Sequence, residues 1–79
     1  MNMPKLISFL TEIDKAEYTS RELILMDIYA HNQFYLTMRQ LRNGRFIKDQ
    51  YKIPLGKKVV MTTNKGRRLL EYLGELQYD

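Results

Sequence analysis

The spacing of apolar residues predicts two helices in the first third of the chain. Residues 5–17 place apolar side chains three and four positions apart, as on one face of a helix, at Leu6, Phe9, Leu10 and Ile13. Residues 19–30 predict a second helix, because Thr19 and Glu22 have the spacing of a capping box. The apolar surface between Leu23 and Ala30 is wide, so we expect this second helix to be the most buried one.

A third helix is predicted over residues 34–42, after a turn at 31–33 in which Asn32 can act as the N-cap. One side of this helix is apolar, with Phe34, Met38 and Leu41. At 100° per residue, the opposite side holds Leu36, Arg39, Gln40 and Asn43, flanked by Tyr35 and Arg42. Asn43 and Gly44 supply residues that tolerate a left-handed backbone at a helix end.

Residues 45–62 predict a β-hairpin. The first strand, over 46–53, is rich in β-branched and aromatic residues, and the return strand covers 59–61. Residues 54–56 read Pro-Leu-Gly, where proline fixes φ and glycine accepts a positive φ, so these residues predict the turn.

Residues 63–77 predict a last helix with Thr63 as its N-cap and an apolar stripe of Leu69, Leu70, Leu73 and Leu76. Gly66 weakens this helix locally. We therefore expect one domain over residues 1–79, mainly α with a β-hairpin (α+β), in the order helix, helix, helix, strand, strand, helix.

Charge is sorted along the chain. Between His31 and Arg68 there are ten Lys or Arg residues and one acid, whereas the rest of the chain has three bases and eight acids. The formal net charge of +4 thus combines a block near +9 with flanks near −5. A folded chain with one cationic face commonly binds a polyanion, most often nucleic acid. The alternative is a solvated basic surface that binds nothing.

The residue inventory argues against several other functions. There is no Cys and His31 is the single His, which excludes disulfides and Cys- or His-based metal clusters, so we expect no cofactor. The chain has no P-loop, Rossmann glycine pattern or triad, and the acids Glu12, Asp14 and Glu17 read as a solvated helix face, so we expect no enzyme. No apolar run reaches the roughly 18 residues of a membrane span, and no signal peptide is evident. We expect a cytoplasmic protein without membrane contact or a small-molecule ligand.

Three stretches resemble the winged helix-turn-helix family, which includes MarR- and PadR-like regulators. Residues 18–24, Tyr-Thr-Ser-Arg-Glu-Leu-Ile, resemble the entry to that family's second helix. Residues 38–47, Met-Arg-Gln-Leu-Arg-Asn-Gly-Arg-Phe-Ile, resemble the end of its recognition helix running into the wing. Residues 60–70, Val-Met-Thr-Thr-Asn-Lys-Gly-Arg-Arg-Leu-Leu, resemble its closing strand and last helix.

Two positions depart from the family pattern. Gly44 falls one residue earlier than the family glycine, and Arg45 takes that place. Thr62 stands where a buried leucine is usual. Both departures concern the start and end of the wing, and neither changes the order of the elements.

The resemblance implies duplex DNA binding, with the third helix in the major groove and the wing on the DNA backbone or in the minor groove. On the exposed side of that helix, Arg39 suits guanine, Gln40 and Asn43 suit adenine, and Leu36 suits a thymine methyl group. Tyr35 and Arg42 lie at the edges and suit phosphates. The same reading assigns sequence-independent phosphate contacts to Lys48, Lys52, Lys57 and Lys58 on the hairpin, with Ser20 and Arg21 at a helix start.

We therefore expect a small transcriptional regulator or DNA-architecture protein of a phage, a plasmid or a prokaryote, acting on the nucleoid or in a virus-infected cell. It should form a homodimer through its first and last helices, which carry apolar stripes and acidic flanks. The alternative is a winged-helix interaction module, such as a phage inhibitor or a subunit of a larger complex. Its basic face would then meet an acidic partner, with Tyr35 and Leu36 as anchors.

Overall fold

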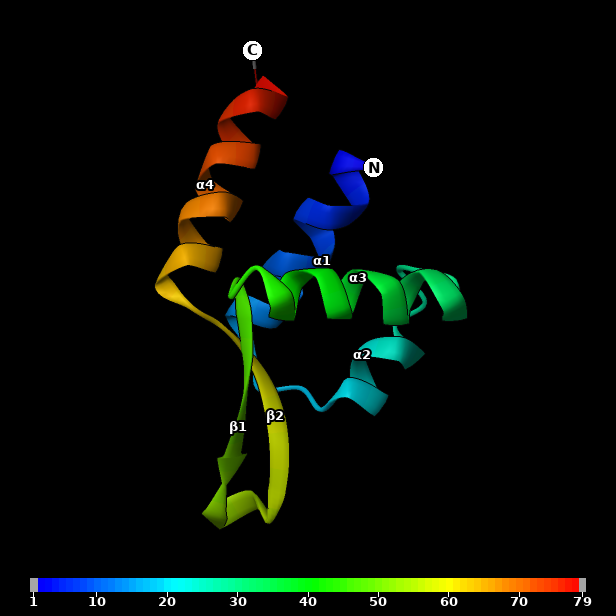
Figure 1. The fold of residues 1–79 in the computed structure, drawn as a ribbon, viewed down its shortest axis with the longest axis vertical. Helices are drawn as coiled ribbons and strands as arrows, with labels where there is room; N and C mark the ends of the chain where they lie inside the picture. Colours follow the sequence, from blue (N-terminus) through cyan, green and yellow to red (C-terminus); the bar gives the residue numbers. More distant parts are fainter. Residues whose placement is uncertain (1, 79) are drawn as a thin grey trace.

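The computed structural model describes residues 2–78, and the side chains of residues 2–76. The elements are α1 (Met3–Lys15), α2 (Ser20–Leu25), α3 (His31–Asn43), β1 (Ile47–Lys52), the 3-10 helix η1 (Ile53–Leu55), β2 (Lys57–Thr62) and α4 (Asn64–Tyr78). Figure 1 shows the hairpin of β1 and β2 projecting away from α1, α3 and α4. The expected fold class and order of elements are confirmed.

The core forms where α1 and α3 pack their apolar faces together. All four residues expected on the α1 face, Leu6, Phe9, Leu10 and Ile13, are buried, as are Phe34, Met38 and Leu41 of α3. The Phe9 ring lies edge-on to Tyr29 at 5.2 Å and to Phe34 at 5.8 Å between ring centroids. Such edge-to-face contacts add specific attraction to the burial of apolar surface. The inner face of α3 is thereby held against α1, which turns its opposite face outward.

Helix α2 is shorter and less buried than expected. The capping box is present, because Thr19 Oγ1 accepts a bond from the Glu22 amide at 3.1 Å and Glu22 Oε1 accepts one from the Thr19 amide at 2.9 Å. The helix nevertheless ends at Leu25, and Asp27 adopts a left-handed φ of 59°. Its backbone turn lets the chain carry Tyr29 into the core. Leu23 alone is buried among the described α2 residues, which overturns the prediction of a most-buried second helix.

The boundaries of α3 also differ from the prediction. Residues 31–33 belong to the helix rather than to a turn, and the N-cap is Ala30 without a side-chain bond, so Asn32 is not the cap. At the other end, Gly44 is right-handed at φ −80°, whereas Arg45 is left-handed at φ 61°. Gly44 is small because a Cβ there would lie 2.5 Å from the Phe46 ring. The strained position therefore falls on the arginine.

The hairpin pairs in antiparallel register from Ile47–Thr62 at its base to Lys52–Lys57 near its tip. As expected, Gly56 closes the turn with φ 63°, and its amide donates to the Lys52 carbonyl at 2.8 Å. The other edge of β2 is met by an isolated bridge between Tyr18 and Val60. The segment before α2 is thus attached to the hairpin.

Helix α4 is joined closely to the base of the hairpin. Thr63 is the N-cap, since its Oγ1 accepts a bond from the Gly66 amide at 3.0 Å, and it also donates to the Arg45 carbonyl at 2.6 Å. A Cβ on Gly66 would collide with the Phe46 carbonyl oxygen, so glycine is required for this approach. The stripe on α4 is buried at Leu73, whereas Leu76 is 45% exposed.

Candidate nucleic-acid interface

The outer surface of α3 presents the residues that the sequence assigned to base contacts. Arg39, Gln40 and Asn43 are exposed, and Tyr35 and Leu36 are 59% and 39% exposed. Among residues 2–76, the side chains of Arg39, Gln40 and Asn43 make no hydrogen bond or ion pair with another described residue. Their donors and acceptors are therefore available to a ligand.

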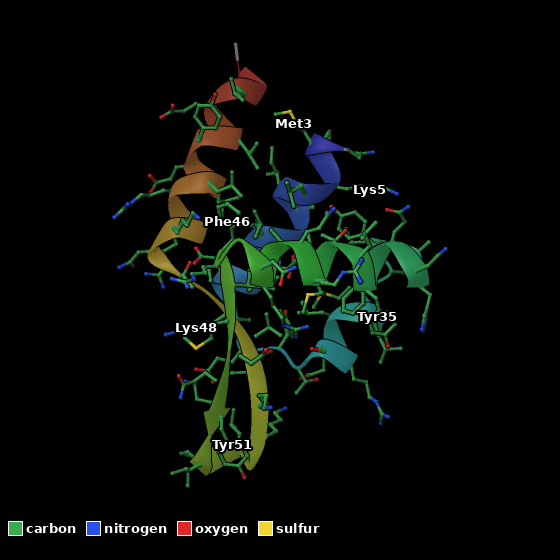
Figure 2. The ribbon with its side chains drawn as sticks, in the orientation of Figure 1. Met3, Lys5, Tyr35, Phe46, Lys48 and Tyr51 are labelled. Atoms are coloured by element: carbon green, nitrogen blue, oxygen red, sulfur yellow. The ribbon has the colours of Figure 1, made fainter. Side chains whose placement is uncertain are left out.

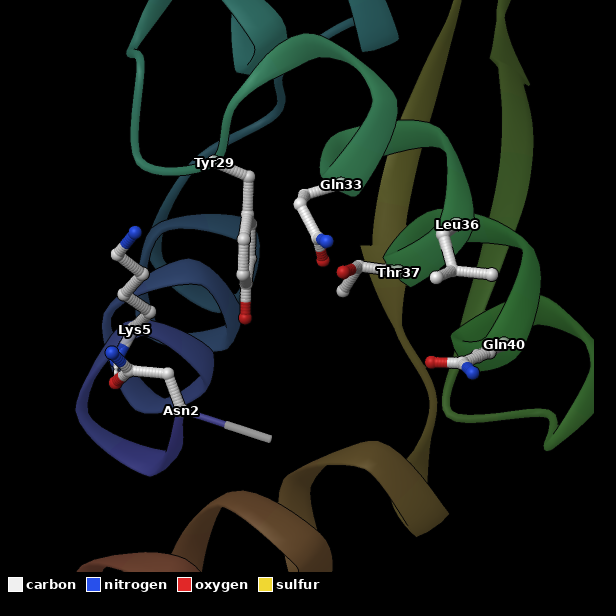
Figure 3. Close-up of a pocket in the computed structure, with 7 residues that line it drawn as sticks. All are labelled: Asn2, Lys5, Tyr29, Gln33, Leu36, Thr37 and Gln40. Carbon is white, nitrogen blue, oxygen red and sulfur yellow. Dashed lines mark hydrogen bonds between the residues drawn. The ribbon is translucent and has the colours of Figure 1, made fainter.

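A separate hollow lies along each flank of this outer surface. One hollow, of 490 Å³, lies between the start of α1 and α3. Figure 3 shows Gln33, Thr37 and Gln40 directed from α3 toward it, on the side where Tyr29 stands. A second hollow, of 460 Å³, lies along the other flank and is lined by His31, Asn32, Tyr35, Leu36 and Arg39. Leu36 borders both hollows, which places it on the ridge of the helix.

Arg42 lies at the meeting point of three elements. Its Nη2 donates to Asp49 Oδ1 of β1 at 3.0 Å and to Ser20 Oγ at the start of α2 at 3.4 Å. Arg42 and Ser20, both assigned to phosphate contacts, are thus brought together, and each is engaged within the protein. Arg21, beside Ser20, is exposed.

The four hairpin lysines do not share one face. The register places Lys48, Lys52 and Lys57 on one face of the hairpin. Lys58 lies on the other face, where it is paired across the strands with Tyr51. In Figure 2, Lys48 points away from α3, and Tyr51 lies near the tip. Two of the lysines are paired with acids from outside the hairpin: Lys52 Nζ lies 3.3 Å from Glu17 Oε1, and Lys57 Nζ lies 3.4 Å from Glu22 Oε1.

A third long-range pair ties α1 to α4. Asp14 Oδ1 accepts bonds from Thr62 Oγ1 at 2.6 Å and from Arg67 Nε at 3.0 Å. These two hydrogen bonds, that from Thr62 first, lower the pKa of Asp14 below its ordinary value. Thr62 is buried at the position where the family has leucine, and its hydroxyl is satisfied by this carboxylate. Asp14 and Glu17 are exposed, as expected, and each is also paired with a distant cation, which the sequence did not indicate.

Glu22 combines local and distant contacts. The hydrogen bonds with Thr19, that from the backbone amide first, lower the pKa of Glu22, and Lys57 adds to the effect. Asp14, Glu17 and Glu22 all come from the acidic flank of the sequence, and each partner comes from the basic block. Charges separated along the chain are thus partly neutralised in space. No local pattern announces this, because the partners are 35 to 53 residues apart.

Two surface features escaped the sequence analysis. A hollow of 570 Å³ at the hairpin base is lined by the cations Arg45, Lys48, Lys65 and Arg67 with four uncharged neighbours. The hairpin tip is apolar and exposed, with Tyr51 at 57%, Ile53 at 83% and Leu55 at 50%. The signal for the tip was the Ile-Pro-Leu sequence itself, which reads first as a turn.

The surface proposed for dimerisation contains exposed apolar groups. Helices α1 and α4 pack against each other, and on α4 Tyr72 is 58% exposed beside the half-exposed Leu76. These two side chains offer apolar area to a second copy. The homodimer itself stays a prediction.

No protein-family model, curated protein or solved structure matches this chain. The arrangement of three helices, a hairpin and a closing helix is consistent with the winged helix-turn-helix layout. Within the described part of the chain, no helix is long and apolar enough to cross a membrane. Among the same residues, no three His, Asp or Glu side chains are grouped as a metal site would need.

Proposed function

We propose that this protein binds duplex DNA with sequence preference, as a small winged-helix regulator or DNA-architecture protein. Helix α3 enters the major groove, and the hairpin acts as a wing on the DNA backbone. The protein acts as a homodimer through α1 and α4, in the cytoplasm where prokaryotic or viral DNA lies.

One observation carries this proposal: the outer face of α3 exposes Arg39, Gln40 and Asn43 together, without partners of their own. Arginine and carboxamide side chains are the groups that bind guanine and adenine edges with paired hydrogen bonds. The inner face of the helix is fixed in the core by Phe34 and Met38. The exposed groups are therefore held on a rigid element, which favours precise readout.

The cations around α3 provide the sequence-independent part of the binding. Arg21, Lys48 and Lys58 are exposed, and Arg42, Lys52 and Lys57 are in exposed ion pairs. Exposed ion pairs contribute roughly 0–1 kcal/mol each, so a phosphate can replace the carboxylate at small cost. Both groups of cations can then contribute to binding.

Salt-dependent binding of the full chain to a random-sequence duplex tests the proposal. We expect fluorescence anisotropy to show affinity that falls with salt, with a slope near −0.9 per phosphate contacted. Selection of bound sequences from a random duplex pool should then enrich a motif, and two half-sites at fixed spacing would reveal the dimer. Absence of binding at low salt would remove DNA from the proposal.

A second candidate function is a protein-interaction module. It is favoured by an apolar hollow between α2 and α3, in which Leu25 is 76% exposed and lies with Ile24, Phe34 and Tyr35. Exposed apolar surface of this kind is a common mark of protein contacts. The partner would then be an acidic protein that meets the cations beside it. Binding to an acidic protein with no affinity for duplex DNA at low salt would favour this alternative.

A further inference from the structure

The tip of the hairpin is apolar where a hairpin in water is usually polar. Ile53, Pro54 and Leu55 form η1, and none of the three is buried. Ile53 is the most exposed large apolar side chain among the described residues, at 83%. The tip lies at the end of the molecule opposite the helices α1 and α4 (Figure 1).

The geometry of the turn does not require these side chains. The Gly56 amide bonds to the carbonyls of Lys52 and Ile53 at 2.8 and 3.1 Å, and Gly56 supplies the left-handed residue. These are backbone interactions that polar residues at positions 53 and 55 would also permit. The apolar side chains therefore add exposed surface without adding to the turn.

The tip is flanked by positive charge on both strands. Lys52 and Lys57 face each other in the last pair of the ladder, and Lys58 follows on the other side of the hairpin. Like charges directly opposite one another weaken a strand pair. Here each lysine is held by one acid, Glu17 or Glu22, in an exposed ion pair. Lys52 and Lys57 lie on one face of the hairpin, one on each strand, so the apolar tip has a cation beside it on both strands. This arrangement complements a groove with phosphates on both walls and stacked bases between them.

We infer that the hairpin tip inserts Ile53 and Leu55 as a wedge into the minor groove and bends the DNA. This inference rests on the proposed DNA binding, and it assigns the protein a role in shaping DNA. Apolar side chains inserted between base pairs part the stack and kink the duplex by about 20–90°. Lys52 of β1 and Lys57 of β2 exchange their carboxylate partners for phosphates along the groove. The bond from Arg42 Nη2 to Asp49 Oδ1 joins α3 to β1, so both elements can contact one duplex.

The test uses the full chain and one duplex in two formats. Anisotropy of a singly labelled duplex reports binding, and energy transfer between dyes at the two ends reports bending. We compare the wild type with the Ile53→Ser/Leu55→Ser double variant. The matched control is Leu25→Ser, which removes an exposed leucine of α2, away from the hairpin. Circular dichroism checks that each variant is folded.

We expect wild type and Leu25→Ser to bind and to raise energy transfer. The affinity of the double variant should lie within roughly tenfold of the wild-type affinity, but its binding should not raise energy transfer. If wild type binds and energy transfer does not change, or if the double variant bends DNA as wild type does, the wedge is wrong while DNA binding stands. No binding by wild type would refute DNA binding and the wedge together.

A further arm covers a double variant that no longer binds the intact duplex. We then use a duplex with a short single-stranded gap at its centre, where bending is already cheap. Restored binding of the double variant to the gapped duplex supports the wedge, because the lost side chains are needed only to bend. Equal failure on both duplexes overturns it.

Discussion

The outer face of α3 and the hairpin both carry polar and cationic side chains, but those of α3 are unpaired within the described residues and two of the hairpin lysines are in ion pairs. On α3, Arg39, Gln40 and Asn43 are exposed over a helix whose inner face is buried. On the hairpin, Lys52 and Lys57 are already paired with acids from other elements. Binding can use the first set directly, whereas the second must exchange partners. The α3 face can therefore contact bases directly, whereas the contribution of the hairpin lysines to binding depends on the salt concentration.

Displacing the hairpin from the helices would break this comparison most strongly. Gly66→Ala places a methyl group against the Phe46 carbonyl oxygen, so α4 must move away from the base of the hairpin. We expect the free energy of unfolding to fall by about 3 kcal/mol, measured by urea denaturation. Gly74→Ala is the control, because no atom lies within 4 Å of the added carbon. That variant should gain about 0.5–1 kcal/mol; equal effects would contradict the tight junction.

Removing one side chain from each region would sharpen the comparison. We expect Arg39→Ala to cost about 2 kcal/mol of binding free energy at the preferred site and to reduce discrimination between sites. Lys57→Ala should weaken all sequences alike and reduce the salt slope by about one. Anisotropy titrations on a selected and a random duplex at several salt concentrations measure both. Uniform losses for both variants would argue against readout by α3.

Acid should loosen the attachment of α1 to α4 through Asp14. Because the folded state lowers the pKa of this carboxyl, its contribution to stability is present above the ordinary value of 3.8 and disappears as the pH falls through the lowered value. Asp14→Asn should lower the free energy of unfolding by about 1 kcal/mol or less at neutral pH, and stability should then fall less steeply as the pH is lowered. Urea midpoints between about pH 7 and pH 2 measure this. Glu75→Gln is the control, and an equally steep fall of stability in Asp14→Asn would contradict the assignment.

Freeing one lysine of the hairpin gives the smallest expected effect. Glu17→Gln removes the partner of Lys52, and exposed pairs of this kind are worth about 0.5 kcal/mol, so the unfolding free energy should change little. DNA affinity at low salt should rise by a few-fold, and the gain should shrink at high salt. Glu71→Gln, the same change on α4, controls for net charge alone. An equal gain in both variants would show that the pairing with Lys52 is irrelevant.

The sequence predicts the elements well where a local signal exists. The capping box at Thr19 and Glu22, the apolar faces of α1 and α3, and the left-handed Gly56 were all readable from short spacing rules. The end of α2 was not, because the burial of Tyr29 against Phe9 competes with a continuous helical pattern. The left-handed Arg45 was hidden for a similar reason, since the neighbouring Gly44 is needed for space beside Phe46.

The exposure of the outer α3 residues was predictable from the sequence, whereas the ion pairs of the hairpin were not. The exposed side of α3 follows from helical periodicity, which identified Arg39, Gln40 and Asn43 in advance. The ion pairs of the hairpin depend on tertiary contacts, and an acid at position 17 or 22 carries no mark of a lysine far along the chain. Strand register decides which lysines share a face, and a shift of one residue would reverse that choice.

The bridge between Tyr18 and Val60 has a consequence for the behaviour of the protein at high concentration. An open strand edge offers a row of unpaired backbone groups on which other chains can assemble. The Val60 amide donates to the Tyr18 carbonyl at 2.8 Å, so that part of the β2 edge is already occupied. The β1 edge carries Lys48 and Lys52, whose charges discourage the approach of another strand. The hairpin can therefore expose an apolar end without templating fibrous aggregates.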